Sequence, residues 1–311
     1  MIKNVVYSIK SPYRRSMDIA SYTFGSGEKT CCVVGALRGT EIQQMAVCAQ
    51  LVDTLRRLEG KGRMAKDGSV TVIPCANYYS MNIGKRFWTM DNTDINRMFP
   101  GYNLGETTQR IADGLFNAVK GYTYGVHVTS FYLEGEFLPH AKIMRVGDAA
   151  EGAYDSLADF GLPYGLIRTP HPYDTTTLHY NWLVWGCKAF SLFTTYTERT
   201  GTRSTQAAVN AVLRFLAARG IIEHSLHKGS HTHIMQEEDM THIHTASAGV
   251  VKNRVSVGHE VNEGDLLCEI IHPLEGYSVE RITAPAAGTV FFSYNKQLVM
   301  ERADVFKLVP F

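Results

Sequence analysis

The sequence lacks an excess of charge of either sign. It contains 31 basic and 30 acidic residues, which leaves a net charge of +1, and no basic run is longer than a pair. A chain with this balance has no electrostatic footprint for nucleic acid or for an anionic membrane surface. We therefore expect no nucleic-acid partner, and any recognition of an anion must depend on local side chains.

Long apolar runs are also missing, and cysteine is sparse. The N-terminal segment MIKNVVYSIKSPYRRS alternates apolar and polar residues, unlike a signal peptide, and no stretch has the length of a membrane span. The six cysteines lie scattered in apolar segments without a CxxC pair, which argues against disulfides or a structural zinc site. The sequence predicts a cytoplasmic protein without a membrane partner, and it leaves homo-oligomerisation open.

Strand and helix patterns alternate over the first two thirds of the chain. A chain of 311 residues is long enough for one large domain and a smaller one. The predicted strands cover residues 29–37, 69–79, 124–131 and 187–198, and the predicted helices cover 40–60, 105–121 and 205–222. This order predicts an α/β fold with a mainly parallel sheet, whose active residues lie on loops at the carboxyl ends of the strands.

The composition changes after residue 222. Residues 223–244 contain six histidines and no long apolar run, and the segments beyond them are short, valine-rich and broken by glycine. Such segments predict a small all-β domain. We predict an α/β domain, a histidine-rich connector and a β domain at residues 1–222, 223–240 and 241–311. The HTH and HIH pairs can hold a transition metal, but without a cysteine or carboxylate at fixed spacing they favour adventitious binding.

Three polar stretches are expected to converge at the edge of the sheet. Arg38 and Glu41 lie in the turn RGTE between a strand and a helix, DNTDINRMFPG forms a polar loop, and His127 ends the apolar strand GVHV. A catalytic zinc ion needs three protein ligands and an open position for water. Glu41 and His127 could supply two of these ligands.

The residues alone leave ordinary interpretations open. Arg38 could be a surface charge beside a glycine turn, and Glu41 could be a first-turn acid that the helix dipole favours. His127 could be a hydrogen-bonded core residue. Asn96 and Arg97 could be a turn former and a solvated charge.

The order of these motifs resembles the succinylglutamate desuccinylase and aspartoacylase family, a zinc-dependent branch of the metallocarboxypeptidase fold. The order is G-x-(basic)-G-x-E, then D-x-N-R-x-F-P-G, then a strand-borne histidine and a C-terminal β domain. The resemblance implies a mostly parallel mixed sheet flanked by helices, with a small C-terminal all-β domain that is barrel-sandwich-like. That domain is similar to biotinyl and lipoyl carrier domains, but the lysine that carries the prosthetic group is missing.

The resemblance implies zinc as cofactor. The turn of the family reads G-x-H-G-x-E, so Glu41 and His127 match zinc ligands while Arg38 stands where the first histidine is expected. An arginine has no lone pair for a metal, and its charge repels one. The site therefore has three outcomes: another histidine completes the ligands, a metal binds weakly, or Arg38 pairs with Glu41 without a metal. The candidate histidines are His140, His171 and His179.

The resemblance also implies how substrate is held. Asn96 and Arg97 match the pair that binds the substrate carboxylate, and a planar guanidinium can grip a carboxylate with two parallel hydrogen bonds. The family places a general base on a late strand. Alignment on Ala189 puts Phe193 at the position of the base, whereas alignment on the acidic residue selects Glu198, which we take as the candidate.

Two functions follow. The first is a metal-dependent hydrolase resembling N-acyl amino acid deacylases, in which metal-activated water cleaves the amide of a small carboxylate-bearing substrate and Arg38 stabilises negative charge. The alternative is a non-catalytic relative that binds a small carboxylate through Arg38 and Arg97.

Overall fold

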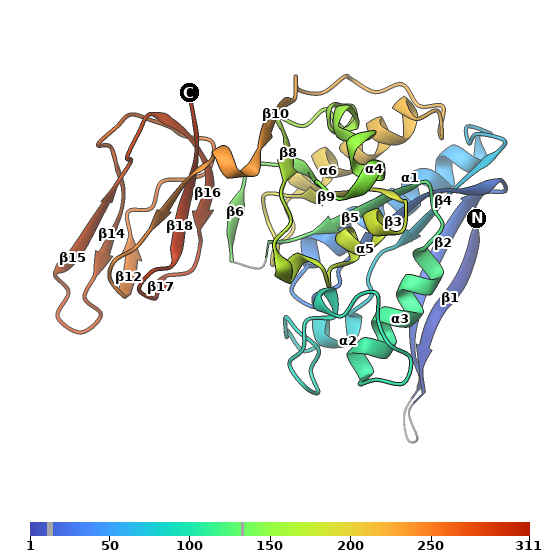
Figure 1. The fold of residues 1–311 in the computed structure, drawn as a ribbon, viewed down its shortest axis with the longest axis horizontal. Helices are drawn as coiled ribbons and strands as arrows, with labels where there is room; N and C mark the ends of the chain where they lie inside the picture. The colour runs from blue at the N-terminus through green and yellow to red at the C-terminus, as the bar shows by residue number, and fades with distance from the viewer. Residues whose placement is uncertain (11–14, 132–133) are drawn as a thin grey trace. The chain divides into compact units, whose positions relative to one another are not determined.

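The chain divides into two units in a computed structural model that describes residues 1–10, 15–131 and 134–311 (Figure 1). The first unit comprises Met1–Ser130 and Pro139–Met235, and the second comprises Phe131–Leu138 and Gln236–Phe311. The segment Phe131–Leu138 thus lies in the second unit, although its position in the sequence falls within the range predicted for the α/β domain. The domain boundaries predicted from the sequence, 1–222, 223–240 and 241–311, stay a prediction.

A nine-stranded mixed sheet organises the first unit. In sheet order the strands are β1 (Ile2–Ile9), β2 (Met17–Gly25), β4 (Gly68–Ile73), β3 (Glu28–Gly35), β5 (Tyr124–Thr129), β9 (Lys188–Phe193), β7 (His140–Met144), β8 (Tyr164–Arg168) and β10 (His233–Gln236). The central strands β4, β3, β5 and β9 run parallel, and β7 also runs parallel to β8. The hairpin β1–β2 and the pairing of β7 with β9 are antiparallel.

Helices and short 3-10 helices connect these strands. They are α1 (Ile42–Gly60), α2 (Tyr78–Met81), η1 (Ile95–Arg97), α3 (Thr107–Val119), α4 (Gly147–Glu151), η2 (Tyr154–Phe160), η3 (Pro172–Asp174), α5 (Leu178–Val184) and α6 (Thr202–Ala218). In α1 the buried Val47, Leu51, Leu55 and Leu58 recur at helical spacing. Full burial of each such side chain contributes about 1.5–3 kcal/mol, which holds the helix on the sheet. No helix among the described residues is long and apolar enough to cross a membrane.

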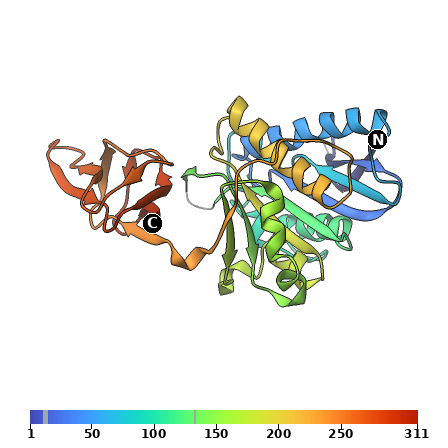
Figure 2. The same cartoon turned by 90° about the horizontal axis from the view of Figure 1, so that it is seen from above.

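Two glycines show which helices cover which face of the sheet. A Cβ atom on Gly35 of β3 would lie 2.7 Å from a side chain of α1, and one on Gly125 of β5 would lie 2.8 Å from an indole ring of α5. Gly35 pairs with Val128 of β5, and paired residues point to the same face of the sheet. Val128 is three residues from Gly125, and side chains alternate along a strand, so the two glycines face opposite sides. Helix α1, together with α6, therefore covers one face, and α5 covers the other (Figure 2). His127 lies two residues after Gly125 and faces α5.

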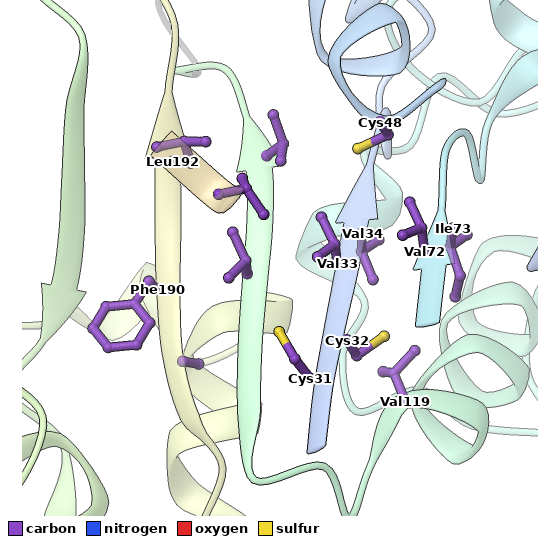
Figure 3. Packing of buried hydrophobic residues seen from close by; sticks show 14 of the residues in the cluster. Cys31, Cys32, Val33, Val34, Cys48, Val72, Ile73, Val119, Phe190 and Leu192 are labelled. Carbon is purple, nitrogen blue, oxygen red and sulfur yellow. The ribbon is translucent and has the colours of Figure 1, made fainter. Parts of the chain in front are cut away.

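The core of the first unit centres on β3. Its residues 31–34 are fully buried on both sides, as expected of a parallel strand between two helix layers. Figure 3 shows Val33 and Val34 of β3 beside Val72 and Ile73 of β4. The six cysteines are unpaired, and burial raises the pKa of Cys75 to about 12. Five of the six cysteines are buried, as expected from the apolar segments in which they lie.

The second unit consists of two antiparallel sheets around a separate apolar core. The five-stranded sheet has the order β11 (Thr241–His244), β18 (Asp304–Pro310), β16 (Gly288–Tyr294) and β13 (Glu260–Val261), and β6 (Gly135–Phe137) also pairs with β16. The four-stranded sheet contains β15 (Ser278–Thr283), β14 (Leu266–Ile271), β12 (Gly249–Lys252) and β17 (Leu298–Val299). A short 3-10 helix, η4 (Glu237–Asp239), precedes β11. The predicted fold class, a mostly parallel α/β sheet followed by an all-β part, is confirmed.

Candidate functional site

Arg38 lies in the turn between the carboxyl end of β3 and α1, and it is only 3% exposed. The next residue, Gly39, explains how the turn packs so closely. A Cβ atom there would lie 2.2 Å from the backbone oxygen of Lys85 and 2.6 Å from the backbone nitrogen of Met81. Only glycine fits at this position, and the turn directs Arg38 into the protein. The interpretation of Arg38 as a surface charge is therefore wrong.

The guanidinium of Arg38 forms a buried cluster with two carboxylates. Its Nε and Nη2 donate to Oδ2 of Asp94 at 2.9 and 2.8 Å. Its Nη1 donates to the backbone oxygen of Ser130 at 3.0 Å and to Oε1 of Glu41 at 3.4 Å. Burial alone would lower the pKa of Arg38, but the attraction of Asp94 and Glu41 outweighs this effect and raises it. Arg38 is thus a fixed cation that two anions surround.

Glu41 is fully buried, and donors surround its carboxylate. Oε1 accepts hydrogen bonds from the backbone nitrogen of Ser130 at 2.9 Å, its Oγ at 2.7 Å and Oγ1 of Thr129 at 3.2 Å, as well as from Arg38. Oε2 accepts from the backbone nitrogen of Arg38 at 3.1 Å. Four donors therefore crowd Oε1, whereas Oε2 accepts a single hydrogen bond and keeps a lone pair.

His127 is buried at the carboxyl end of β5, with 1% of its surface exposed. Its Nε2 has no hydrogen-bond partner among the residues that the structure describes. Burial, with a further contribution from the charge of Arg38, lowers the pKa of His127 to about 3, although Asp94 partly opposes this effect. His127 is therefore a neutral imidazole with an unsatisfied nitrogen, which is unusual for a core residue.

The three further histidines that were candidate ligands are engaged elsewhere. Nε2 of His179 contacts the backbone oxygen of Ala189 at 3.0 Å, and its Nδ1 contacts Oγ of Ser191 at 2.7 Å. A carbonyl only accepts, so Nε2 carries the proton and Nδ1 accepts from the serine. His140 stacks on Phe193 at 4.6 Å, and His171 stacks on Tyr173 at 5.2 Å.

These donors do not fit the zinc ion that the family resemblance implies. Arg38 offers no lone pair, so Oε2 of Glu41 and Nε2 of His127 are two ligands where a zinc site needs at least three. Over residues 1–10, 15–131 and 134–311, no group of three His, Cys, Asp or Glu side chains at this site is close enough to share a metal ion. The assignment of Glu41 and His127 as ligands stays a prediction that this geometry disfavours.

Asn96 and Arg97 lie on η1, directly after Asp94. Oδ1 of Asn96 accepts from the backbone nitrogen of Leu178 at 3.2 Å, which leaves its Nδ2 available. Nη1 of Arg97 donates to the backbone oxygen of Tyr173, and the guanidinium lies over that ring at 5.3 Å. Its Nε and Nη2 have no partner in the described part of the chain. The free edge of Arg97 and the amide of Asn96 can together bind a carboxylate.

The charge around Arg97 also favours an anion. Its Nη1 lies 3.9 Å from Oδ1 of Asp174, and Arg168 donates to Oδ2 of the same carboxylate at 3.0 Å. Two guanidinium groups thus approach one buried carboxylate, and Arg97 is the more exposed of the two. Arg97 remains 27% exposed, so a ligand from solvent can reach it.

Glu198, the candidate base, lies on an exposed loop beyond the end of β9. The strand stops at Phe193, so the predicted strand over 187–198 extends five residues too far at its carboxyl end. The backbone nitrogen of Gln43 donates to the backbone oxygen of Thr197 at 3.0 Å, and Nε2 of Gln44 donates to Oγ1 of Thr194 at 3.1 Å. These buried glutamines of α1 hold the loop, and sequence reasoning did not assign them a role. Two adjacent glutamines in the first turn of an amphipathic helix were the available signal.

Comparisons with known proteins agree with this architecture. The family model for the succinylglutamate desuccinylase/aspartoacylase catalytic domain matches residues 28–178, which include the Arg38 turn, η1 and His127. Over these residues the chain matches the family that the motifs predicted.

Individual relatives are distant. N-alpha-acetyl-L-2,4-diaminobutyric acid deacetylase from Halomonas elongata is 21% identical over 263 residues, which cover 78% of this chain and 70% of the relative. A crystal structure of a succinylglutamate desuccinylase from a Silicibacter species has a TM-score of 0.81 at 20% identity and covers 98% of this chain and 92% of its own. The ectoine utilization protein from Ruegeria pomeroyi in its product-bound form has a TM-score of 0.79 at 20% identity, with coverage of 95% and 90%. Likeness at this identity establishes the shared fold.

Proposed function

We propose that this chain binds small carboxylate-bearing molecules of the acyl amino acid class and does not hydrolyse them through a zinc ion at Arg38, Glu41 and His127. The observation that carries the proposal is the buried pairing of Arg38 with Glu41 and Asp94. It supports the third outcome left open by the sequence, in which Arg38 pairs with Glu41 without a metal.

Asn96 and Arg97 support the ligand class. Their free Nδ2, Nε and Nη2 atoms are donors only, and they suit the oxygens of a carboxylate. The ligand class also accords with the names of the relatives, which act on an acetylated or succinylated amino acid. In this proposal Arg97 supplies the charge and Asn96 fixes the orientation, while Arg38 serves to keep the neighbouring carboxylates neutralised. The unpaired thiols accord with a cytoplasmic location, which belongs to the proposal.

The second candidate function is amide hydrolysis. The match to the family model and the unsatisfied Nε2 of His127 favour it. A neutral imidazole is able to accept a proton from water. However, a pKa near 3 makes His127 a weak base, and Glu198 lies on an exposed loop. Hydrolysis along this route therefore lacks the strong activation of water that a metal supplies.

Calorimetric titration with a panel of N-acetyl and N-succinyl amino acids, followed by an assay for the released amine, tests both candidates. We expect a ligand that binds without amine release. Arg97→Met should weaken binding at least tenfold, because loss of a bidentate charged pair removes about 1.5–3 kcal/mol per hydrogen bond. Arg57→Met is the matched control, since Arg57 is an exposed arginine of α1, and it should bind normally. Amine release that disappears in Glu41→Gln would instead establish the hydrolase.

A further inference from the structure

His242, His244 and Asp304 gather on one surface of the second unit. They are the one group of three His, Cys, Asp or Glu side chains in the described chain whose donor atoms lie within 4.8 Å of one another. The two histidines form the HIH motif on β11, and the aspartate comes from β18, sixty-two residues after His242. The carboxylate that the histidine pair lacked in the sequence is therefore supplied by the fold.

The sheet is built so that these three side chains meet. His242 and His244 are two residues apart on a strand, so they point to the same face, and their rings lie 6.3 Å apart. A β-bulge falls between Ile243 and His244, and it places Asp304 opposite His244. A regular register would place Val305 there, but its side chain is buried in the core. Bulges commonly re-aim a side chain in this way.

The distances between these groups are also compatible with metal ligands. Nδ1 of His242 lies 3.3 Å from Oδ2 of Asp304, and Nε2 of His244 lies 3.3 Å from Oδ1. A charge-assisted N–H···O bond is normally about 2.7–2.9 Å long. Two ligand atoms that each bind zinc at about 2.0–2.2 Å in tetrahedral geometry are roughly 3.3–3.5 Å apart. Nδ1 of His242 forms a long hydrogen bond with Oδ2 of Asp304 in the absence of a metal, and the separations also fit the spacing of zinc ligands.

Exposure also matches a site that takes an ion from solvent. The histidine side chains are 38% and 53% exposed, whereas Asp304 is 15% exposed. Lys307 lies opposite His242, and its Nζ lies 4.8 Å from the centroid of the Phe131 ring. Its positive charge opposes a bound cation, so we expect moderate affinity.

We propose that His242, His244 and Asp304 form a binding site for a first-row divalent metal ion such as zinc. Two imidazoles and one carboxylate are borderline ligands that suit zinc, cobalt and nickel, and three ligands leave a position for water. Strand β11 is an edge strand, with β18 as its one neighbour in the sheet order. A metal ion bound to both strands would fasten this edge of the sheet. The site is independent of the function proposed for the first unit.

The test is zinc titration of the full chain, made without a histidine tag and stripped with a chelator. We expect one zinc ion per chain and a rise in the thermal midpoint of unfolding. His244→Ala and Asp304→Asn should each weaken zinc binding at least tenfold and abolish the rise. Asp304→Asn keeps the size of the side chain, and circular dichroism checks the fold of both variants.

Control variants separate this site from other histidines. His231→Ala removes an exposed connector histidine, and His127→Ala removes the free nitrogen of the first unit. Both should bind zinc as the unchanged protein does. The proposal is overturned if His244→Ala and Asp304→Asn bind zinc normally, or if His231→Ala loses as much affinity as they do. Loss of binding in His127→Ala alone would place the metal in the first unit and would also overturn it.

Discussion

Replacing Arg38 with methionine removes a buried positive charge while it keeps most of the side-chain length. Asp94 then loses the two hydrogen bonds to its Oδ2, and Glu41 loses its ionic partner. Removal of one partner from a buried ion pair typically costs about 3–5 kcal/mol, because the remaining charge is uncompensated. We expect Arg38→Met to destabilise the first unit by about that amount.

Tryptophan fluorescence during urea unfolding measures this effect. Trp88, Trp182 and Trp185 are the three tryptophans of the chain and all lie in the first unit, so the signal reports that unit. With a urea m-value of about 2–3 kcal/mol per M, the midpoint should fall by about 1–2 M. Arg57→Met breaks an exposed pair with Asp53 and should cost less than about 1 kcal/mol.

A triple variant separates charge from packing. Arg38→Met combined with Glu41→Gln and Asp94→Asn removes all three charges with little change in volume. It should be more stable than Arg38→Met alone, because groups within one network are not additive. The explanation fails if Arg38→Met is no less stable than Arg57→Met, or if the triple variant is the least stable.

Three further predictions concern the same unit. His127 has a pKa of about 3 when folded and an ordinary value of 6.5, so the unfolded chain takes up its proton first. The free energy of unfolding should decrease as the pH is lowered from 6.5 to about 3, by up to ~1.4 kcal/mol per pH unit. His127→Asn should remove this dependence, and urea unfolding at pH 5 and at pH 7 measures it. Gly39→Ala forces a Cβ atom against the backbone and should cost about 1–3 kcal/mol in the same assay. A chelator should leave carboxylate binding unchanged in calorimetry, whereas a loss of binding would implicate a metal.

Much of the fold was predictable because its signals are local. The apolar run of β3, the helical spacing of α1 and the glycines at their ends lie within a few residues of one another. The end of β9 was not predictable, because the loop after Phe193 is held by Gln43 and Gln44 from a distant helix. The hairpin β1–β2 and the edge strand β10 were also missed, since the exposed residues of β1 and β10 weaken their apolar patterns.

The candidate site was predictable in its members but not in its pairing. The sequence identified Arg38 and Glu41 from the turn motif, and it left their ion pair as one outcome. It did not indicate that Asp94 and Ser130 would bind the same guanidinium, because these residues are 56 and 92 positions away. The partners of a buried charge depend on which loops meet at the sheet edge. In the same way, nothing near the HIH motif pointed to Asp304.

Because the positive charge at this site belongs to Arg38, it does not depend on the supply of metal ions. A metalloenzyme must acquire its ion after synthesis, and its activity follows the availability of that ion. The guanidinium of Arg38 is covalently part of the chain, so every molecule contains one, and it cannot dissociate. Whatever ligand the site binds, starvation for trace elements should leave its charge unchanged.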